Sequence, residues 1–166
     1  HESIVNTLIE HKADVNAART DNGITPLNIA SQEAHESIVN TLIEHKANVN
    51  AARTDNGITS LYVASFEGHN SIVNTLIEHK ANVNAARTDN GITPLFIASG
   101  QGHESIVNTL IENKANVNAA KTDDGRTPLF MASREGHESI VNTLIEHKAN
   151  VNAARTDNGI APLYAA

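Results

Sequence analysis

Cysteine and tryptophan are absent from the 166 residues, and aromatic residues make up only 3% of them. The lack of cysteine excludes disulfides and thiol chemistry, although it identifies no redox compartment. So few rings are unusual for a compact sphere with one central core, and they suit a row of small clusters built from Ile, Val, Leu and Ala. No apolar run approaches the roughly 20 residues of a membrane-spanning helix.

Clustered positive charge is also missing. The chain has 12 Lys and Arg against 19 Asp and Glu, a net charge of −7, and the acidic residues are spread evenly. Phosphate binding needs a basic stripe, so we expect no nucleic-acid partner and no membrane partner. The chain begins at His1 without a signal peptide, which predicts a piece of a longer, cytoplasmic chain.

One phrase is present five times. "RTDNGITPL" starts at Arg19, and close copies follow at intervals of 34 residues. A fixed period of this length indicates a repeat array rather than an ordinary globular domain. We therefore expect a single array over residues 1–166, divided into a partial repeat (1–20), four full repeats (21–54, 55–88, 89–122 and 123–156) and a partial repeat (157–166).

Each unit is predicted to hold two helices and a tight turn. Asn22-Gly23 accepts the positive φ angles of a hairpin, and Thr25-Pro26 is typical of an N-cap followed by proline in the first turn. A short first helix follows, and a second begins near Glu36 with its apolar residues at helical spacing. Their inward residues are expected to be Leu27, Ala30 and Ser31, then Ile38, Val39, Leu42 and Ile43.

A lone unit cannot cover its apolar face, whereas stacked copies cover one another. The first helix packs through small residues such as Ala30 and Ser31, and the second through bulkier ones such as Ile38 and Leu42. The stack should therefore curve, with the first helices and the hairpin tips on the concave side. The sequence thus predicts an all-α solenoid of helix-turn-helix units joined by β-hairpin-like loops.

The unit resembles the ankyrin repeat, and the resemblance covers the whole chain. The family pattern is matched by Gly91, Thr93, Pro94, Leu95, Ala98, Gly102, His103, Ile106, Val107, Leu110, Ile111, Ala115, Asn118 and Ala119. Ankyrin repeats are overwhelmingly protein-binding scaffolds. The resemblance therefore implies a non-enzymatic protein-interaction module without a cofactor, whose partner the sequence does not name.

Several residues depart from the family pattern. The histidine that follows Thr-Pro-Leu is replaced by Asn28, Tyr62, Phe96, Phe130 and Tyr164. The glycine that ends the second helix is replaced by Lys12, Lys46, Lys80, Lys114 and Lys148. A left-handed non-glycine residue costs roughly 1–2 kcal/mol, so either strain recurs or the helix ends differently. Ala34 replaces a glycine and Ser60 a proline, and we expect both units to be locally weaker.

Nine histidines suggest a metal site at first sight. They lie ten residues apart within a unit, without a neighbouring Cys or an HExxH spacing, and histidines of successive units are about 8–10 Å apart. We expect packed or capping histidines and no metal. No Ser-His-acid set and no phosphate loop stands apart from the repeat, so we expect no catalysis.

A Val-Asn pair recurs at the end of each unit, with its asparagine at Asn50, Asn84, Asn118 and Asn152. In some eukaryotic ankyrin proteins the matching asparagine is hydroxylated by an oxygenase. The alternative is that this side chain braces the hairpin through backbone hydrogen bonds.

Differences between copies gather on the first helix, because "SIVNTLIE" of the second helix is identical in all five copies. Two variable positions, such as 28 and 32, are four residues apart and share one helix face. We hypothesise that a partner protein lies along this concave face, because aromatic residues and Arg are typical anchors. The candidate contacts are Tyr62, Phe66, Phe96, Phe130, Arg126, Arg134, Asn28 and Gln32. Secondary candidates at the hairpin tips are Arg53, Arg87, Arg155, Ile58 and Ile92.

Two alternatives stay open. The aromatic side chains could only fill gaps between repeats. The array could instead be a spacer or spring whose length is its function. Five periods of 34 residues would take 170 residues, four more than the chain has, and neither end has a polar cap, which repeat arrays need for solubility. We therefore expect head-to-tail self-association of molecules through an open contact.

Overall fold

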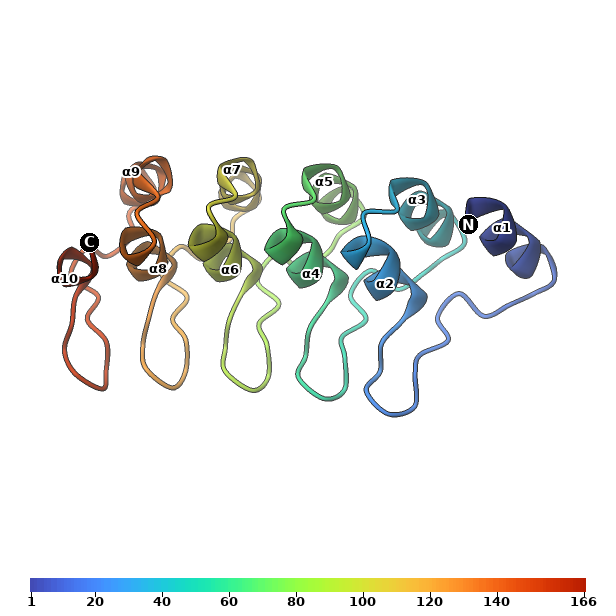
Figure 1. Ribbon diagram of the computed structural model, residues 1–166, viewed down its shortest axis with the longest axis horizontal. Helices are drawn as coiled ribbons and strands as arrows, with labels where there is room; N and C mark the ends of the chain where they lie inside the picture. The colour runs from blue at the N-terminus through green and yellow to red at the C-terminus, as the bar shows by residue number, and fades with distance from the viewer. The chain divides into compact units, whose positions relative to one another are not determined.

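The computed structural model describes residues 1–166 as two compact units, His1–Asn82 and Val83–Ala166. Each unit is built from short helices joined by long loops, and the chain contains no β-strand (Figure 1). An isolated antiparallel bridge between Ala52 and Thr59 is the nearest approach to a hairpin ladder. The predicted all-α stack of helix pairs is confirmed, and the loops resemble β-hairpins without forming strands.

The first unit holds five helices: α1 (Glu2–Glu10), α2 (Pro26–Gln32), α3 (Glu36–Glu44), α4 (Ser60–Glu67) and α5 (Asn70–Glu78). The first helices α2 and α4 pack side by side, as do the second helices α3 and α5, and each first helix contacts its own second helix. Helix α1 has the position of a second helix and packs on α3. Long loops extend from the first helices, away from the second helices (Figure 1).

The second unit repeats this arrangement with five helices: α6 (Pro94–Gln101), α7 (Glu104–Glu112), α8 (Pro128–Arg134), α9 (Glu138–Glu146) and α10 (Pro162–Ala165). Helix α8 packs between α6 and α10, and α7 packs beside α9. The structure is described as two compact units, so the single array over residues 1–166 and its expected curvature stay predictions.

The first helices begin where the sequence predicts. The Thr25 hydroxyl accepts the backbone N–H of Asn28 at 3.3 Å, and the next three first helices repeat this cap with their own threonine. The first helical residue is proline in α2, α6 and α8, where its missing N–H costs nothing. In α4 it is Ser60. Helix α10 has Ala161 in place of the threonine, lacks a side-chain cap and is only four residues long.

The core consists of one apolar cluster in each repeat. Leu27, Ala30 and Ser31 of α2 are buried against Val39 and Leu42 of α3. The equivalent leucines of α4 to α9 are at most 2% exposed: Leu61, Leu76, Leu95, Leu110, Leu129 and Leu144. The inward face predicted for both helices is therefore confirmed, and stability depends on contact between neighbouring repeats.

The lysine that ends each second helix adopts the left-handed conformation. Lys12, Lys46, Lys80, Lys114 and Lys148 have φ between 66 and 69°. Of the two alternatives that the sequence left open, the recurring left-handed lysine is the one observed. Ala34, with φ of 58°, adds a further left-handed residue where the equivalent copies have glycine.

Candidate protein-interaction surface

The outer face of the first helices, by which we mean their solvent-exposed side, carries differences between copies. In the first unit it exposes Ile29 of α2 by 46% and Phe66 of α4 by 41%. Val63 is half-buried beside them, and the carboxylates Glu33 and Glu67 are exposed at the ends of the two helices. Because α2 and α4 pack side by side, their outward side chains form one surface. We call Ile29, Gln32, Val63 and Phe66 the apolar ridge.

Four of the predicted contacts are buried in the structure, and the contact role of these residues stays a prediction. Exposure is 3% for Asn28, 7% for Tyr62 and 3% each for Phe96 and Phe130. They occupy the first turn of each helix, which is covered by packing, whereas residues four positions later lie at the open end. A shared helix face therefore did not mean shared exposure. Their burial favours the alternative in which these side chains fill gaps between repeats.

The Asn28 side chain has a structural role, because it forms hydrogen bonds to Thr25 in its own helix cap and to Ser60 of the next repeat. Its side-chain oxygen accepts the backbone N–H of Thr25 at 3.0 Å, which completes a capping box. Its amide nitrogen donates to the Ser60 hydroxyl at 2.9 Å, and both residues are buried. The repeat that has Asn28 in place of an aromatic residue is thus followed by the repeat that has Ser60 in place of proline. We expect this hydrogen bond to offset part of the weakening predicted at Ser60.

In the second unit the arginine candidates are engaged in ion pairs. Arg126 is half-buried, and its Nε lies 2.7 Å from a carboxylate oxygen of Asp124. Arg134 is exposed but pairs with the adjacent Glu135 at 2.5 Å. Met131 packs close to Gly100, whose missing side chain makes room for it. This face is therefore more polar than the apolar ridge.

The hairpin tips hold the secondary candidates in a repeating ion pair. Arg53 donates to Asp55 at 2.7 Å, and Arg87 donates to Asp89 at 2.5 Å. The hydrogen bond from each Arg holds the pKa of its partner carboxyl below the ordinary value. Arg155 forms the same pair with Asp157 and lies 5.9 Å from the Phe130 ring centre. Ile58 and Ile92 are half-buried beneath these tips.

An asparagine brace joins the loops of successive repeats. The Asn50 side chain accepts the backbone N–H of Asn82 at 2.7 Å and donates to the Lys80 carbonyl at 3.1 Å. Asn16, Asn84 and Asn118 make the same pair of bonds to the following repeat. The predicted bracing role is confirmed. Each brace also holds the carbonyl of a left-handed lysine, so one repeat helps to fix the strained turn of the next.

Several histidine side chains hydrogen-bond to backbone carbonyl groups, either of another repeat or of their own helix. His69 Nε2 lies 3.0 Å from the carbonyl oxygen of Gln32, and His137 Nε2 lies 3.1 Å from that of Gly100. His79 Nδ1 contacts the carbonyl of Thr75 in its own helix at 2.8 Å. No group of three His, Cys, Asp or Glu side chains is arranged to hold a metal ion.

Ile29 is exposed on this face but was not among the contacts predicted from the sequence. It is the most exposed large apolar residue of α2, and its position differs between copies as Ile29, Val63, Ile97 and Met131. That variation was the available signal, because position 29 is three residues from 32 and shares its helix face.

Antiparallel helix pairs stacked at a fixed period, with a Thr-Pro-Leu start and hairpin loops, define a helical repeat protein. A comparison with protein families matches ankyrin repeats, in sets of three copies, over residues 1–87 and 84–155. The chain therefore belongs to the ankyrin-repeat family. A search of curated proteins found no match.

Ankyrin repeats are generally protein–protein interaction modules, and the family is generally non-enzymatic. None of the ten helices is long and apolar enough to cross a membrane.

Proposed function

We propose that this chain recognises a partner protein through the outer face of its first helices, with the apolar ridge of the first unit as the main contact. One observation carries the proposal: the copies differ on this face, and there the chain exposes Ile29 and Phe66. A few well-packed side chains near the centre of an interface carry most of its binding energy.

The charge around the ridge indicates the partner's chemistry. Glu33 and Glu67 flank it, and the chain carries a net charge of −7. A partner that presents an apolar anchor between basic residues would match this surface, because opposite potentials speed association and exclude wrong partners. In the second unit, Met131 and the exposed Arg134 offer a separate and more polar contact.

The test is to capture partners from the source cell with the chain and to measure the affinity of the captured protein for variants. Phe66→Ser and Ile29→Ser should each weaken binding at least about tenfold, the change expected for an interface anchor. The matched control is Ile145→Ser, since Ile145 is 45% exposed but lies on the second helix α9. Equal affinity of the ridge variants and the control would refute the proposal.

Variants of the buried rings provide a second test, which distinguishes the apolar ridge from the aromatic contact set predicted from the sequence. Phe96→Ala and Phe130→Ala should destabilise the fold by about 3–5 kcal/mol, because both rings are only 3% exposed. At a temperature where each variant stays folded, its affinity for the partner should be unchanged. A selective loss of affinity without loss of stability would instead favour the aromatic contact set predicted from the sequence.

A spacer role is the alternative, and the identical second helices favour it. "SIVNTLIE" recurs without change, so the surface of these helices is the same in each copy. A spacer should lose function when any one repeat is deleted, whichever repeat is chosen. A recognition module should lose function only with the repeats that carry the ridge, at residues 21–54 and 55–88.

A further inference from the structure

The end of helix α4 places an exposed ring next to an exposed carboxylate. Phe66 is 41% exposed, and Glu67, which is also exposed, is the last residue of the helix. The Glu67 carboxylate forms no ion pair or hydrogen bond within the chain. Basic residues are absent from the last turn of α4, so the negative end of the helix dipole adds to the charge of Glu67.

The second unit shows what the equivalent glutamate does when an arginine precedes it. Arg134 and Glu135 stand two repeats after Phe66 and Glu67. Arg134 donates through Nε and Nη2 to one carboxylate oxygen of Glu135, at 2.8 and 2.5 Å. It is also the basic residue in the last turn of α8, where the helix dipole stabilises a cation. Phe66 replaces this arginine in α4, so Glu67 lacks the cation that Glu135 has.

The first unit supplies no cation to Glu67. Arg53 at the hairpin tip is paired with Asp55 at 2.7 Å. Glu33, the C-cap of the neighbouring helix α2, is exposed, and its side chain accepts a hydrogen bond from the amide of Gln32 at 3.3 Å. The surface around Phe66 is therefore apolar and negatively charged, and the group that complements it is a cation with an apolar body.

Arginine has both properties. Its planar guanidinium donates several hydrogen bonds to a carboxylate and stacks over aromatic rings, whereas the lysine ammonium is a strongly hydrated point charge. The methylene stem of arginine covers apolar surface. This chain already contains one stacked pair, because the Arg155 guanidinium lies 5.9 Å from the centre of the Phe130 ring. The pairs Arg134–Glu135 and Arg155–Phe130 thus show the two halves of an arginine site.

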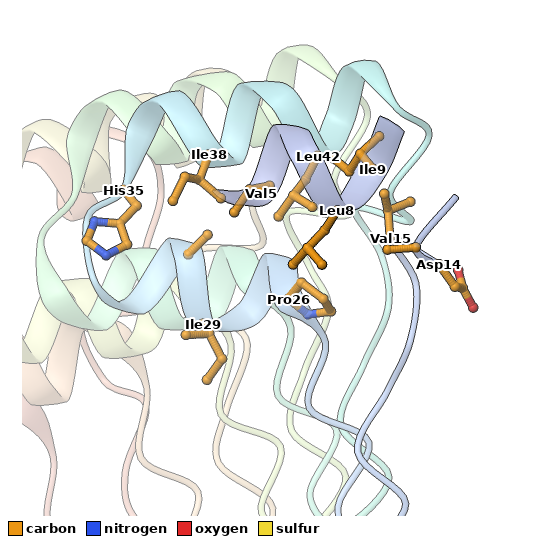
Figure 2. A pocket seen from close by; sticks show the side chains of 12 residues that line it. Val5, Leu8, Ile9, Asp14, Val15, Pro26, Ile29, His35, Ile38 and Leu42 are labelled. Carbon is orange, nitrogen blue, oxygen red and sulfur yellow. The ribbon is translucent and has the colours of Figure 1, made fainter. Parts of the chain in front are cut away.

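Ile29, the other exposed large apolar residue of the ridge, has a different setting. It lines an apolar hollow of about 360 Å³ between α1, α2 and α3, together with Leu8 and Pro26 (Figure 2). That hollow opens beside α1, the first helix of the sequence. Phe66 lies on α4, which has a complete repeat before it and another after it in the sequence. Its exposure therefore does not depend on the first or the last helix of the chain.

We propose that Phe66 and Glu67 bind an arginine side chain of the partner protein. The guanidinium lies over the Phe66 ring and donates to the Glu67 carboxylate, as Arg134 donates to Glu135. Val63, one turn earlier on α4 and half-buried, contacts the methylene stem. Resting on the proposed recognition function, this site specifies the partner as a protein segment that presents arginine beside an apolar side chain.

Binding of short labelled peptides to the 166-residue chain, followed by fluorescence anisotropy, tests the proposal. The probe is a blocked peptide of alternating arginine and leucine, compared with otherwise identical peptides that carry lysine or glutamate in place of arginine. The arginine peptide should bind about three- to fivefold more tightly than the lysine peptide, because a planar guanidinium stacks on the ring and donates to the carboxylate together. The glutamate peptide should not bind measurably, since Glu33 and Glu67 repel it.

Variants of the chain locate the site. Glu67→Gln should weaken binding of the arginine peptide about fivefold and remove most of the preference for arginine over lysine. Phe66→Leu, which keeps an apolar side chain but removes the ring, should weaken binding about threefold. The matched control is Glu78→Gln, because Glu78 is exposed at the end of the second helix α5 and its loss changes the net charge equally. This control should bind like the unmodified chain, and circular dichroism should show that all three variants stay folded, because each position is exposed.

Two results with the peptides would overturn the arginine site. They are equal affinity of the arginine and lysine peptides for the unmodified chain, and an equal effect of Glu67→Gln and Glu78→Gln on the arginine peptide.

The captured partner separates this site from the recognition function. An affinity that falls with Phe66→Ser but not with Glu67→Gln would overturn the arginine site and leave recognition through the apolar ridge standing. Arginine-selective peptide binding beside a partner whose affinity is unchanged by Phe66→Ser would instead refute recognition through the ridge and support the arginine site.

Discussion

The left-handed lysines allow a direct measurement of stored strain. Lys46, Lys80 and Lys114 have φ of 69, 68 and 69°, a conformation that costs a non-glycine residue about 1–2 kcal/mol. Glycine adopts it without that cost but loses about 0.5–1 kcal/mol more conformational entropy on folding. Replacing one lysine by glycine rather than by alanine should therefore stabilise the fold by about 0.5–1 kcal/mol.

Alanine is the proper reference because it removes the same charge as glycine. A lysine at a helix C-terminus contributes about 0.3–1 kcal/mol through the helix dipole, and both variants lose this equally. The three sites are 34 residues apart in sequence, so their effects should add. The triple glycine variant should be more stable than the triple alanine variant by about 1.5–3 kcal/mol, which corresponds to roughly 3–12 °C in melting temperature.

Thermal and urea unfolding followed by circular dichroism measure the difference between the triple variants. The urea dependence of the unfolding free energy should be the same in both, so that the midpoints can be compared. A triple alanine variant as stable as the triple glycine variant would show that the left-handed turns are not strained. The asparagine braces, which hold the carbonyls of these lysines, would then have no strain to offset.

The remaining predictions concern the braces and the hairpin tips. Asn50→Ala removes bonds to Asn82 and Lys80 and should destabilise the fold by about 1–2 kcal/mol in urea unfolding. Asn152→Ala should leave the free energy of unfolding unchanged. An equal loss of stability in Asn50→Ala and Asn152→Ala would contradict the bracing role. Hydrogen bonds from Arg53 and Arg87 lower the pKa of Asp55 and Asp89, so their contribution is present above the ordinary pKa of about 3.9 and is lost as pH falls below it. NMR titration of these carboxyl groups should give midpoints below about 3.9, and midpoints at or above that value would refute the pairing.

The sequence alone was sufficient to predict the repeat, its two helices and their inward faces. The reason is that these features are local. Thr25-Pro26 and Asn22-Gly23 determine where a helix starts and where the chain turns. The spacing of Leu42 and Ile43 determines which side of a helix is apolar. The 34-residue period then requires the repeats to stack, because no single repeat can cover its own apolar face.

The exposure of particular residues could not be derived in this way, because it depends on residues in the next repeat. Tyr62 and Phe66 share a helix face, yet packing covers one and leaves the other exposed. Asn28 and Ser60 differ from the other copies in successive repeats, and only the structure shows that the two side chains are hydrogen-bonded to each other. Burial and pairing between repeats are determined by how neighbouring helices approach one another, which the linear pattern of a single repeat does not contain.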